Sequence, residues 1–536
     1  MDLSKTLKKY KFLIFILIIL SILKIDFRFK DELNCCSDDF DYFIHSETIV
    51  EDFDFDYSNQ LEQLEKQRFY KNNKPAPIGF VGTGVYSAPF MFIGIVFDKI
   101  FNSIGLKNTN SIVSYKLLFY SFSSIFYLFF TVKYLKDSLK KLNIDYKILD
   151  LTILILGVGI SYYAFERYSM THVYEAFSLT MLIYFSIKFY QDKNKSSAIL
   201  IPIFAVLGFS VKWVHFYFFI LPLIIKLMFF SENESRLTKL KEFWISSVLS
   251  SSAFLLINKL IYGVYTINPS YVYVADTETN IKIEDLDGFW RNTVEILSEF
   301  INRFMIILFT QEFGLLWFSP IIFVGTVLSI IYLIQSLKKN RYEIFGAFLL
   351  SLSFAQVIFI TILWKSPGSA YGFRYIYNLF PLAIIVYYFY KSKYKFKRLH
   401  TLLLFISLFS FISTLFFEST ELTQLSLEPE LNSFGIMSRF TERYYLEGYL
   451  GSFLEINSYL KLFVTSFLGA IILKIFLLFV TPDSVFSFLD SLGLPADNEN
   501  FVNLVSDLQY IDIYYFLIVF LLIIILYYYF DKKIIN

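Results

Sequence analysis

Long apolar stretches alternate with short charged segments along the whole chain. A helix of roughly 20 apolar residues is long enough to cross the hydrocarbon core of a bilayer. The pattern therefore predicts an all-α, polytopic integral membrane protein with about 13 transmembrane helices (roughly 11–14). We place the predicted membrane helices at 11–25, 112–132, 148–165, 173–190, 196–212, 213–230, 242–263, 312–335, 343–364, 372–390, 399–417, 456–480 and 511–530.

The segment 86–104 is apolar as well, but its ends suit a helix that lies at the membrane interface. Pro89 stands near its start, and Asp98 and Lys99 stand near its end. Loops on the inner side of a membrane are enriched in Lys and Arg. If the N-terminus is inside and this segment does not cross, the lysine-rich loops all fall on the inner side; they lie within 133–147, 188–195, 236–241, 338–341 and 391–398. We therefore predict that 86–104 does not cross the membrane.

The same arrangement makes 26–111 a first outer loop that carries interfacial helices. Further outer segments are predicted at 166–172, 264–300, 365–374 and 418–455. The C-terminal end fits less well, because 481–510 is acidic yet would lie inside. We divide the chain into a transmembrane module at 1–417, which includes the first outer loop, and a C-terminal part at 418–536 to which the sequence assigns no role.

Composition agrees with a membrane protein and excludes several other classes. Of the 536 residues, 56% are hydrophobic and 18% are charged, against about 25% charged residues in soluble proteins. The net charge of +1 and the lack of a basic, aromatic-interleaved surface argue against a nucleic-acid partner. The only cysteines, Cys35 and Cys36, are adjacent, so no disulfide framework or zinc quartet is expected. With four histidines in the chain, a His-rich metal site is not expected, whereas a carboxylate site for Mg²⁺ or Mn²⁺ stays open as an alternative.

Acidic residues are concentrated at the start of the first outer loop. They are Asp31, Glu32, Asp38, Asp39, Asp41, Glu47, Glu51, Asp52, Asp54 and Asp56. Carboxylates are costly near a bilayer, and a carboxylate held at the membrane surface can act as a general base for an attacking hydroxyl. Neighbouring carboxylates raise one another's pKa, which keeps one of them basic enough for this task. The alternative is a solvated acidic loop without a chemical role.

Several motifs in this loop resemble those of membrane glycosyltransferases of the GT-C class, which include protein O-mannosyltransferases and lipid A aminoarabinose transferases. The sequence Asp-Asp-Phe-Asp-Tyr at 38–42 resembles their Asp-Glu-x-x-Tyr/Phe motif, with Asp39 in place of the usual Glu. The segment 46–56 is similar to their Ser-Leu-Leu-x-Asp-Gly-Asp-x-Asp segment, with Phe53 in place of Gly. Pro77-Ile-Gly79 and Tyr86-Ser-Ala-Pro89 look like the proline-glycine loop before their interfacial helix.

Later segments resemble the same class in the same order. Glu312 to Pro320 is similar to the "FGLL-x-x-SP" start of a middle helix, and Trp364 to Tyr375 resembles the "W-x-GG-x-x-x-G-x-R" outer turn. Tyr168 to His172 looks like a recurrent outer Ser-His turn. The resemblance covers about 11–390 and does not extend beyond 400.

The resemblance implies a GT-C fold and assigns roles to individual residues. Asp38 would be the general base, with Asp39 and Asp41 supporting it. Arg374 would hold a lipid phosphate together with Lys365 or Lys74, because Arg offers bidentate donors to a phosphate. The glycines at 368 and 372 would let the ligand approach closely; the alternative for Arg374 is an interfacial side chain that reaches lipid headgroups. Residues expected in supporting positions are Tyr42, Asp54, Asp56, Glu166 and His172.

A structural interpretation exists for Glu166 with Arg167 and for His215. Glu166 and Arg167 could form an ordinary structural pair at a helix end, and His215, beside Lys212 and Trp213, is interpreted as a packed side chain rather than a catalytic one.

The function implied is transfer of a sugar from a polyprenyl-phosphate donor to an acceptor glycan, lipid or protein. The reaction would occur at the outer face of the membrane, which is the cytoplasmic membrane if the protein is bacterial, and would invert the anomeric configuration. Membrane lipids are the other expected partners. One alternative is a polysaccharide polymerase or ligase that uses lipid-linked glycans, which the acidic loop 418–455 favours. The other is a secondary transporter, and the lack of an internal repeat argues against it.

Overall fold

The computed structural model describes only part of the chain. The described residues are 3–25, 28, 37–61, 70–71, 74–77, 79–108, 110–230, 237–268, 300–301, 304–309, 314–363, 373–394, 396–416, 430–431, 437–438, 459, 462–491 and 499–535.

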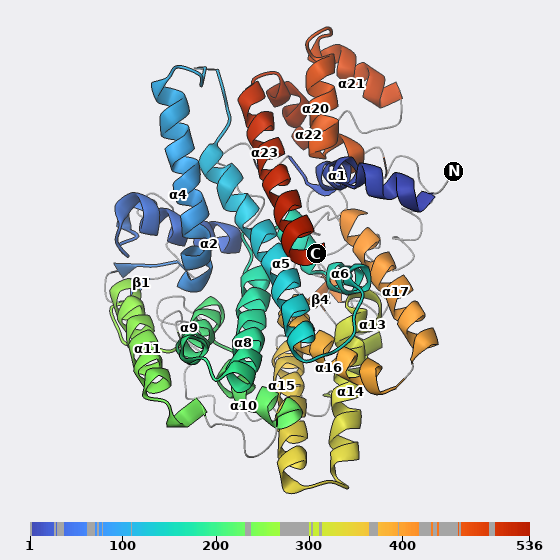
Figure 1. Ribbon diagram of the computed structural model, residues 1–536. Helices are drawn as coiled ribbons and strands as arrows, with labels where there is room; N and C mark the ends of the chain where they lie inside the picture. The colour runs from blue at the N-terminus through green and yellow to red at the C-terminus, as the bar shows by residue number, and fades with distance from the viewer. Residues whose placement is uncertain are drawn as a thin grey trace.

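The described chain is almost entirely helical (Figure 1). Its α-helices are α1 Leu3–Ile22, α2 Ser37–Glu47, α3 Ser58–Leu61, α4 Val81–Ser103, α5 Tyr115–Lys141, α6 Ile148–Leu156, α7 Ile160–Phe165, α8 His172–Asp192, α9 Lys195–Val211, α10 Tyr217–Phe229, α11 Lys241–Tyr262, α13 Leu315–Phe318, α14 Pro320–Ser336, α15 Arg341–Leu363, α16 Phe380–Lys393, α17 Lys397–Phe416, α20 Phe467–Phe476, α21 Pro482–Ser491, α22 Glu499–Leu508 and α23 Ile513–Tyr529. Shorter 3₁₀ or π segments are η1 Thr48–Asp52, η2 Leu237–Lys239, η5 Arg374–Leu379 and η7 Phe530–Ile535. Two short antiparallel pairs are formed by β1 Tyr70–Lys71 with β2 Lys74–Pro75 and by β3 Glu430–Leu431 with β4 Met437–Ser438.

Six of the described helices are long and apolar enough to cross a membrane, namely 81–103, 115–141, 241–262, 341–362, 397–415 and 513–532. Five of them match predicted spans, and the sixth is α4. The helical, membrane-compatible character of the chain is therefore confirmed, while the number of 13 spans stays a prediction. The predicted span 148–165 is divided between α6 and α7, next to Gly157, where a Cβ atom would lie 2.4 Å from the carbonyl oxygen of Ser407 on α17.

The two features that argued against a crossing by 86–104 have local explanations. Pro89 lies inside α4 rather than before it. The carboxylate of Asp98 accepts hydrogen bonds from the ammonium of Lys107 at 2.9 Å and from the backbone N–H of Lys116 at 2.8 Å, so its charge is compensated within the protein. By length and composition α4 can span a bilayer. The distribution of Lys and Arg favours a helix that does not cross, so the interfacial placement of 86–104 stays a prediction.

The helix α8 lies at the centre of the bundle and positions the polar site. It packs against α5, α9, α10, α16 and η5, and side chains around its whole circumference are buried. A helix that is enclosed on all sides exposes no polar face to solvent. Polar residues at the start of α8 are therefore enclosed by protein, and they must find partners on the neighbouring segments.

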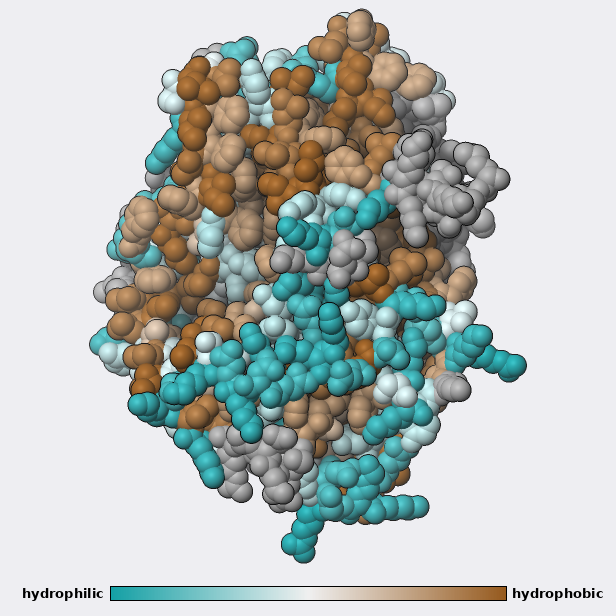
Figure 2. Space-filling view, viewed as in Figure 1, coloured by the Kyte–Doolittle hydropathy of each residue, from teal (hydrophilic) through white to brown (hydrophobic). Residues whose placement is uncertain are grey.

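The C-terminal helix α23 lies beside α5 and α1 (Figure 1). Phe15 on α1 stacks on Phe530 at a centroid distance of 5.6 Å, and Lys24 forms a β-bridge with Ser466. Apolar side chains cover the upper part of the face in Figure 2, where α4 and α23 lie, and hydrophilic side chains gather below them. Exposed apolar residues of these two helices include Phe92 on α4 and Leu521 on α23. An apolar exposed surface of this kind suits contact with lipid.

Candidate functional site

The acidic motif forms the first turns of α2. Carboxylates at this position are favoured by the unpaired N–H groups and the dipole of the helix N-terminus. Asp39 and Asp41 are buried, with 1% and 3% of their surface exposed. Asp39 Oδ2 accepts a hydrogen bond from Arg167 Nη2 at 2.7 Å, and both side chains are nearly fully buried. Asp38 lies in the first turn of α2, and its side chain lies outside the described part of the structure.

A buried histidine fixes α2 in place. His45 Nε2 lies 2.8 Å from the carbonyl oxygen of Gly79 and donates to it, so Nδ1 accepts a hydrogen bond from the Tyr57 hydroxyl at 2.5 Å. Burial lowers the pKa of His45 to about 4, which keeps the ring neutral. At Gly79 a Cβ atom would lie 2.7 Å from the ring of Tyr42, so the half-buried Tyr42 packs directly on this loop. These contacts join α2 to the segment that precedes α4.

The predicted turn between Glu166 and His172 lies beside the acidic motif. Glu166 caps the end of α7 and is buried, and Arg167 pairs with Asp39 across 128 residues of sequence. Arg167 thus forms a long-range pair that involves the motif, while a local pair of Glu166 with Arg167 stays an interpretation. His172 is the first residue of α8 and is also buried.

The fully buried Arg28 contacts the end of α7, directly before this turn. Its Nη2 donates to the carbonyl oxygen of Phe165, and its Nη1 donates to the carbonyl oxygen of Lys24 at 2.7 Å. Its own carbonyl oxygen accepts a hydrogen bond from the Tyr515 hydroxyl on α23 at 2.5 Å. The end of α7 is therefore held by a residue that α23 holds in turn.

The turn at 166–172 also contacts Arg374. Arg374 Nη1 lies 4.0 Å from the Sδ atom of Met170. At the end of the same turn, the ring of Tyr163 contacts the ring of His172 at a centroid distance of 4.5 Å. The turn thus contacts the acidic motif through Arg167 and Arg374 through Met170.

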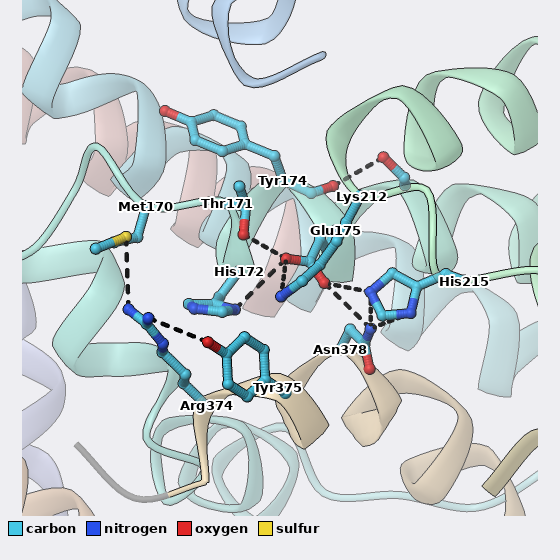
Figure 3. A network of polar contacts seen from close by, with 11 residues as sticks. Met170, Thr171, His172, Tyr174, Glu175, Lys212, His215, Arg374, Tyr375 and Asn378 are labelled. Atoms are coloured by element: carbon cyan, nitrogen blue, oxygen red, sulfur yellow. Dashed lines mark hydrogen bonds and ion pairs between the residues drawn. The ribbon is translucent and has the colours of Figure 1, made fainter. Parts of the chain in front are cut away.

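A buried carboxylate next to this group organises a second network, which we name the Glu175 cluster (Figure 3). Its members are Thr171, His172, Glu175, Lys212, His215 and Asn378. Glu175 is fully buried, and its Oε1 accepts a hydrogen bond from Thr171 Oγ1 at 2.5 Å. Its Oε2 lies 2.6 Å from His215 Nε2 and 3.1 Å from Asn378 Nδ2. A charge enclosed in this way is costly without partners, and here several donors surround it.

Lys212 of the Glu175 cluster and Arg374 beside it both lie near the ring of Tyr375. Lys212 Nζ lies 3.7 Å from Glu175 Oε1 and 4.4 Å from the centroid of the Tyr375 ring. Arg374 Cζ lies 5.2 Å from the same centroid, and Arg374 Nη2 donates to the Tyr375 hydroxyl at 3.3 Å. Fixed cations of this kind can neutralise an anionic group of a substrate.

The other predicted site residues lie apart from this region or outside the described chain. Asp54 and Asp56 are exposed. They shape a turn, because Asp54 Oδ1 accepts from the backbone N–H of Asp56 and Asp56 Oδ1 accepts from Ser58. Lys74 lies on β2, and its side chain is outside the described part of the structure, as is the whole of Lys365. The described structure thus brings together Asp39, Glu166, His172 and Arg374, and it leaves Asp54 and Asp56 at the surface.

Sequence reasoning missed Glu175, and it underestimated His215. His215 does pack, since it stacks on Phe218 at 5.5 Å, but it also binds Glu175. The available signal was a carboxylate inside an apolar segment, which usually indicates a functional site. Among the residues that the structure describes, no three His, Cys, Asp or Glu side chains converge in a way that could hold a metal ion.

Comparison of the chain with protein-family models, with curated proteins and with solved structures finds no match.

Proposed function

We propose that this protein is a membrane glycosyltransferase that transfers a sugar from a polyprenyl-phosphate donor to an acceptor at the outer face of the membrane. One observation carries the proposal beyond the motif resemblance. The buried ion pair between Asp39 and Arg167 joins the acidic motif to the turn at 166–172, and Met170 of the same turn contacts Arg374 Nη1 at 4.0 Å. Burial of this many charges is costly, and such charges in a membrane protein usually serve a function.

The geometry refines the role of each carboxylate. Asp39 is committed to Arg167, so it acts as a positioning residue that fixes the first turn of α2. Asp38, its neighbour, is the proposed general base. The acceptor oxygen attacks the anomeric carbon, the bond from this carbon to the phosphate oxygen breaks, and the phosphate leaves with the electron pair. The hydroxyl proton passes to Asp38, and Arg374 stabilises the charge on the departing phosphate.

The first prediction is that Asp38→Asn lowers sugar transfer by about 10²–10⁴-fold, because the amide cannot accept the proton. Transfer is measured in cells as the amount of the modified envelope glycan, by mass spectrometry, against a strain without the protein. Asp54→Asn is the matched control, since Asp54 is an exposed carboxylate of the same loop and lies outside the buried group. Wild-type glycan levels with Asp38→Asn would remove Asp38 from the mechanism.

A secondary transporter is the second candidate, because a buried acidic residue beside histidines is also typical of a proton-coupled pathway. The two functions differ in the acidic motif, which only the transferase needs. A strain that loses envelope glycan on Glu175→Gln but keeps it on Asp38→Asn would favour the transporter.

A further inference from the structure

Lys212 occupies an unusual position between two helices. It follows α9 with an extended backbone, at φ −159° and ψ 108°, which directs its side chain back over the start of α8. Only 14% of the side chain is exposed. Its ammonium forms no hydrogen bond with any residue in the described part of the chain; its contacts there are the ion pair with Glu175 and the ring of Tyr375. A largely buried ammonium whose three N–H donors lack oxygen acceptors is poised to bind a ligand oxygen.

The Glu175 cluster explains how this position is held. Thr171, His215 and Asn378 all contact the Glu175 carboxylate. Lys212, at 3.7 Å, supplies the nearby formal positive charge. The carboxylate therefore draws the ammonium toward Tyr375 without occupying its donors by hydrogen bonds.

Arg374 provides the second half of the site. Because Lys212 Nζ and Arg374 Cζ lie 4.4 and 5.2 Å from one ring centroid, the two cations lie within about 10 Å of each other. Charge-assisted hydrogen bonds from each would be about 2.7–2.9 Å long. A phosphate group has enough oxygens to engage a guanidinium fork and an ammonium at the same time, which a single hydroxyl of a sugar cannot do.

We infer that Lys212 and Arg374, which both lie near the ring of Tyr375, bind the oxygens of one phosphate group, and that Glu175 is the positioning residue for Lys212. The inference deepens the proposed function and rests on it for the identity of the phosphate as that of the lipid-linked donor. The same chemistry would also accept free phosphate or a phospholipid headgroup, so the experiment separates these sources.

The test uses the full chain in detergent, in phosphate-free buffer, with farnesyl phosphate, farnesol, inorganic phosphate and phosphatidylglycerol as probes. We expect farnesyl phosphate to bind the wild type more tightly than the other three. Lys212→Met should weaken this binding by about 10- to 100-fold, as expected for the loss of a hydrogen bond to a charged group. Lys212→Arg should keep most of the affinity. Lys259→Met is the matched control, because Lys259 on α11 also lies over a tyrosine ring, 4.5 Å from the centroid of Tyr265, and does not belong to the Glu175 cluster.

A second measurement needs no variant. An amine-reactive acetylating reagent should modify Lys212 more slowly when farnesyl phosphate is bound, while modification of Lys259 stays unchanged, as read by peptide mass spectrometry. Unchanged modification of Lys212, or equal affinity of the wild type and Lys212→Met for farnesyl phosphate, overturns the inference. Tighter binding of inorganic phosphate or phosphatidylglycerol than of farnesyl phosphate overturns the assignment to a lipid-linked donor. The glycosyltransferase proposal is judged separately by the Asp38→Asn glycan measurement, so the two can fail independently.

Discussion

The same stretch of chain, η5 followed by α16, connects two polar clusters that differ in depth. At one end Asn378 belongs to the Glu175 cluster, in which Glu175 is fully buried. At the other end Tyr387 and Lys391 contact His400, which also lies 2.8 Å from Asp150. We name this second group the His400 cluster. Its ion pair is partly open, with 13% of the His400 side chain and 15% of the Asp150 side chain exposed.

The contrast shows how burial changes what similar side chains do. Both clusters combine a histidine, a carboxylate and a lysine. In the His400 cluster the histidine contacts both charged groups, whereas in the Glu175 cluster the carboxylate does. A partly solvated pair exchanges protein contacts for water at little cost, so it mainly joins α6, α16 and α17. A fully enclosed carboxylate must keep its partners in place, and it can therefore hold a lysine in a position that solvent would not maintain.

The largest stability effect should come from Glu175→Ala. It leaves Lys212 without its counter-ion and leaves the donors of Thr171, His215 and Asn378 without their shared acceptor. We expect a loss of about 3–5 kcal/mol in the free energy of unfolding. Denaturant unfolding of the detergent-solubilised protein measures it. A loss below about 1 kcal/mol, the range of an exposed pair, would break the contrast between the clusters.

A pH effect of intermediate size should come from His45, the buried histidine of α2. Burial lowers the pKa of His45 to about 4, against an ordinary value of about 6.5. The unfolded chain then binds the proton more readily than the folded one, so the contribution of this group is present above about pH 6.5 and is lost as the pH falls toward 4. The full loss corresponds to about 3 kcal/mol.

Thermal unfolding between pH 7 and pH 4 measures this effect. His45→Gln should flatten the dependence of the unfolding temperature on pH, whereas Tyr57→Phe, which removes the hydrogen-bond partner but keeps the histidine, should preserve it. An identical slope for His45→Gln and the wild type would show that His45 does not titrate in this way.

The smallest effect should come from Asp150→Asn in the His400 cluster. The pair it breaks is partly solvated, so we expect a loss of only about 0–1 kcal/mol. Denaturant unfolding, as for Glu175→Ala, measures this loss and compares the two clusters directly. A loss as large as that of Glu175→Ala would mean that exposure does not distinguish the clusters.

Much of the helical architecture followed from the hydrophobic pattern, because long apolar stretches have few alternatives to helix in a membrane. The predicted spans 343–364 and 399–417 correspond closely to α15, Arg341–Leu363, and α17, Lys397–Phe416. The division of 148–165 was not predicted, since it coincides with the close approach of α17 at Gly157, and contacts between distant helices leave no local signal in one sequence.

The candidate site was predicted only in part, again because contacts between distant segments leave no local signal in one sequence. The acidic motif and Arg374 stand out locally, because charges in short polar segments are easy to recognise. Two partners of Glu175, His215 and Asn378, are 40 and 203 residues away. A carboxylate within an apolar stretch indicates a site, but it does not indicate these partners. Its meaning depends on which residues surround it in space, and neither spacing nor composition contains that information.

The contact of Tyr515 with Arg28 has a consequence for biosynthesis. Arg28 supports the end of α7 beside Arg167, yet its carbonyl oxygen is held by a hydroxyl that lies 487 residues further along the chain. The ribosome completes α2, α7 and α8 long before it reaches α23. The acidic motif and its arginine can therefore meet early, but their support is complete only once α23 has entered the bundle. A nascent chain that stops before α23 would carry every proposed catalytic residue and still lack the hydrogen bond from Tyr515 to Arg28.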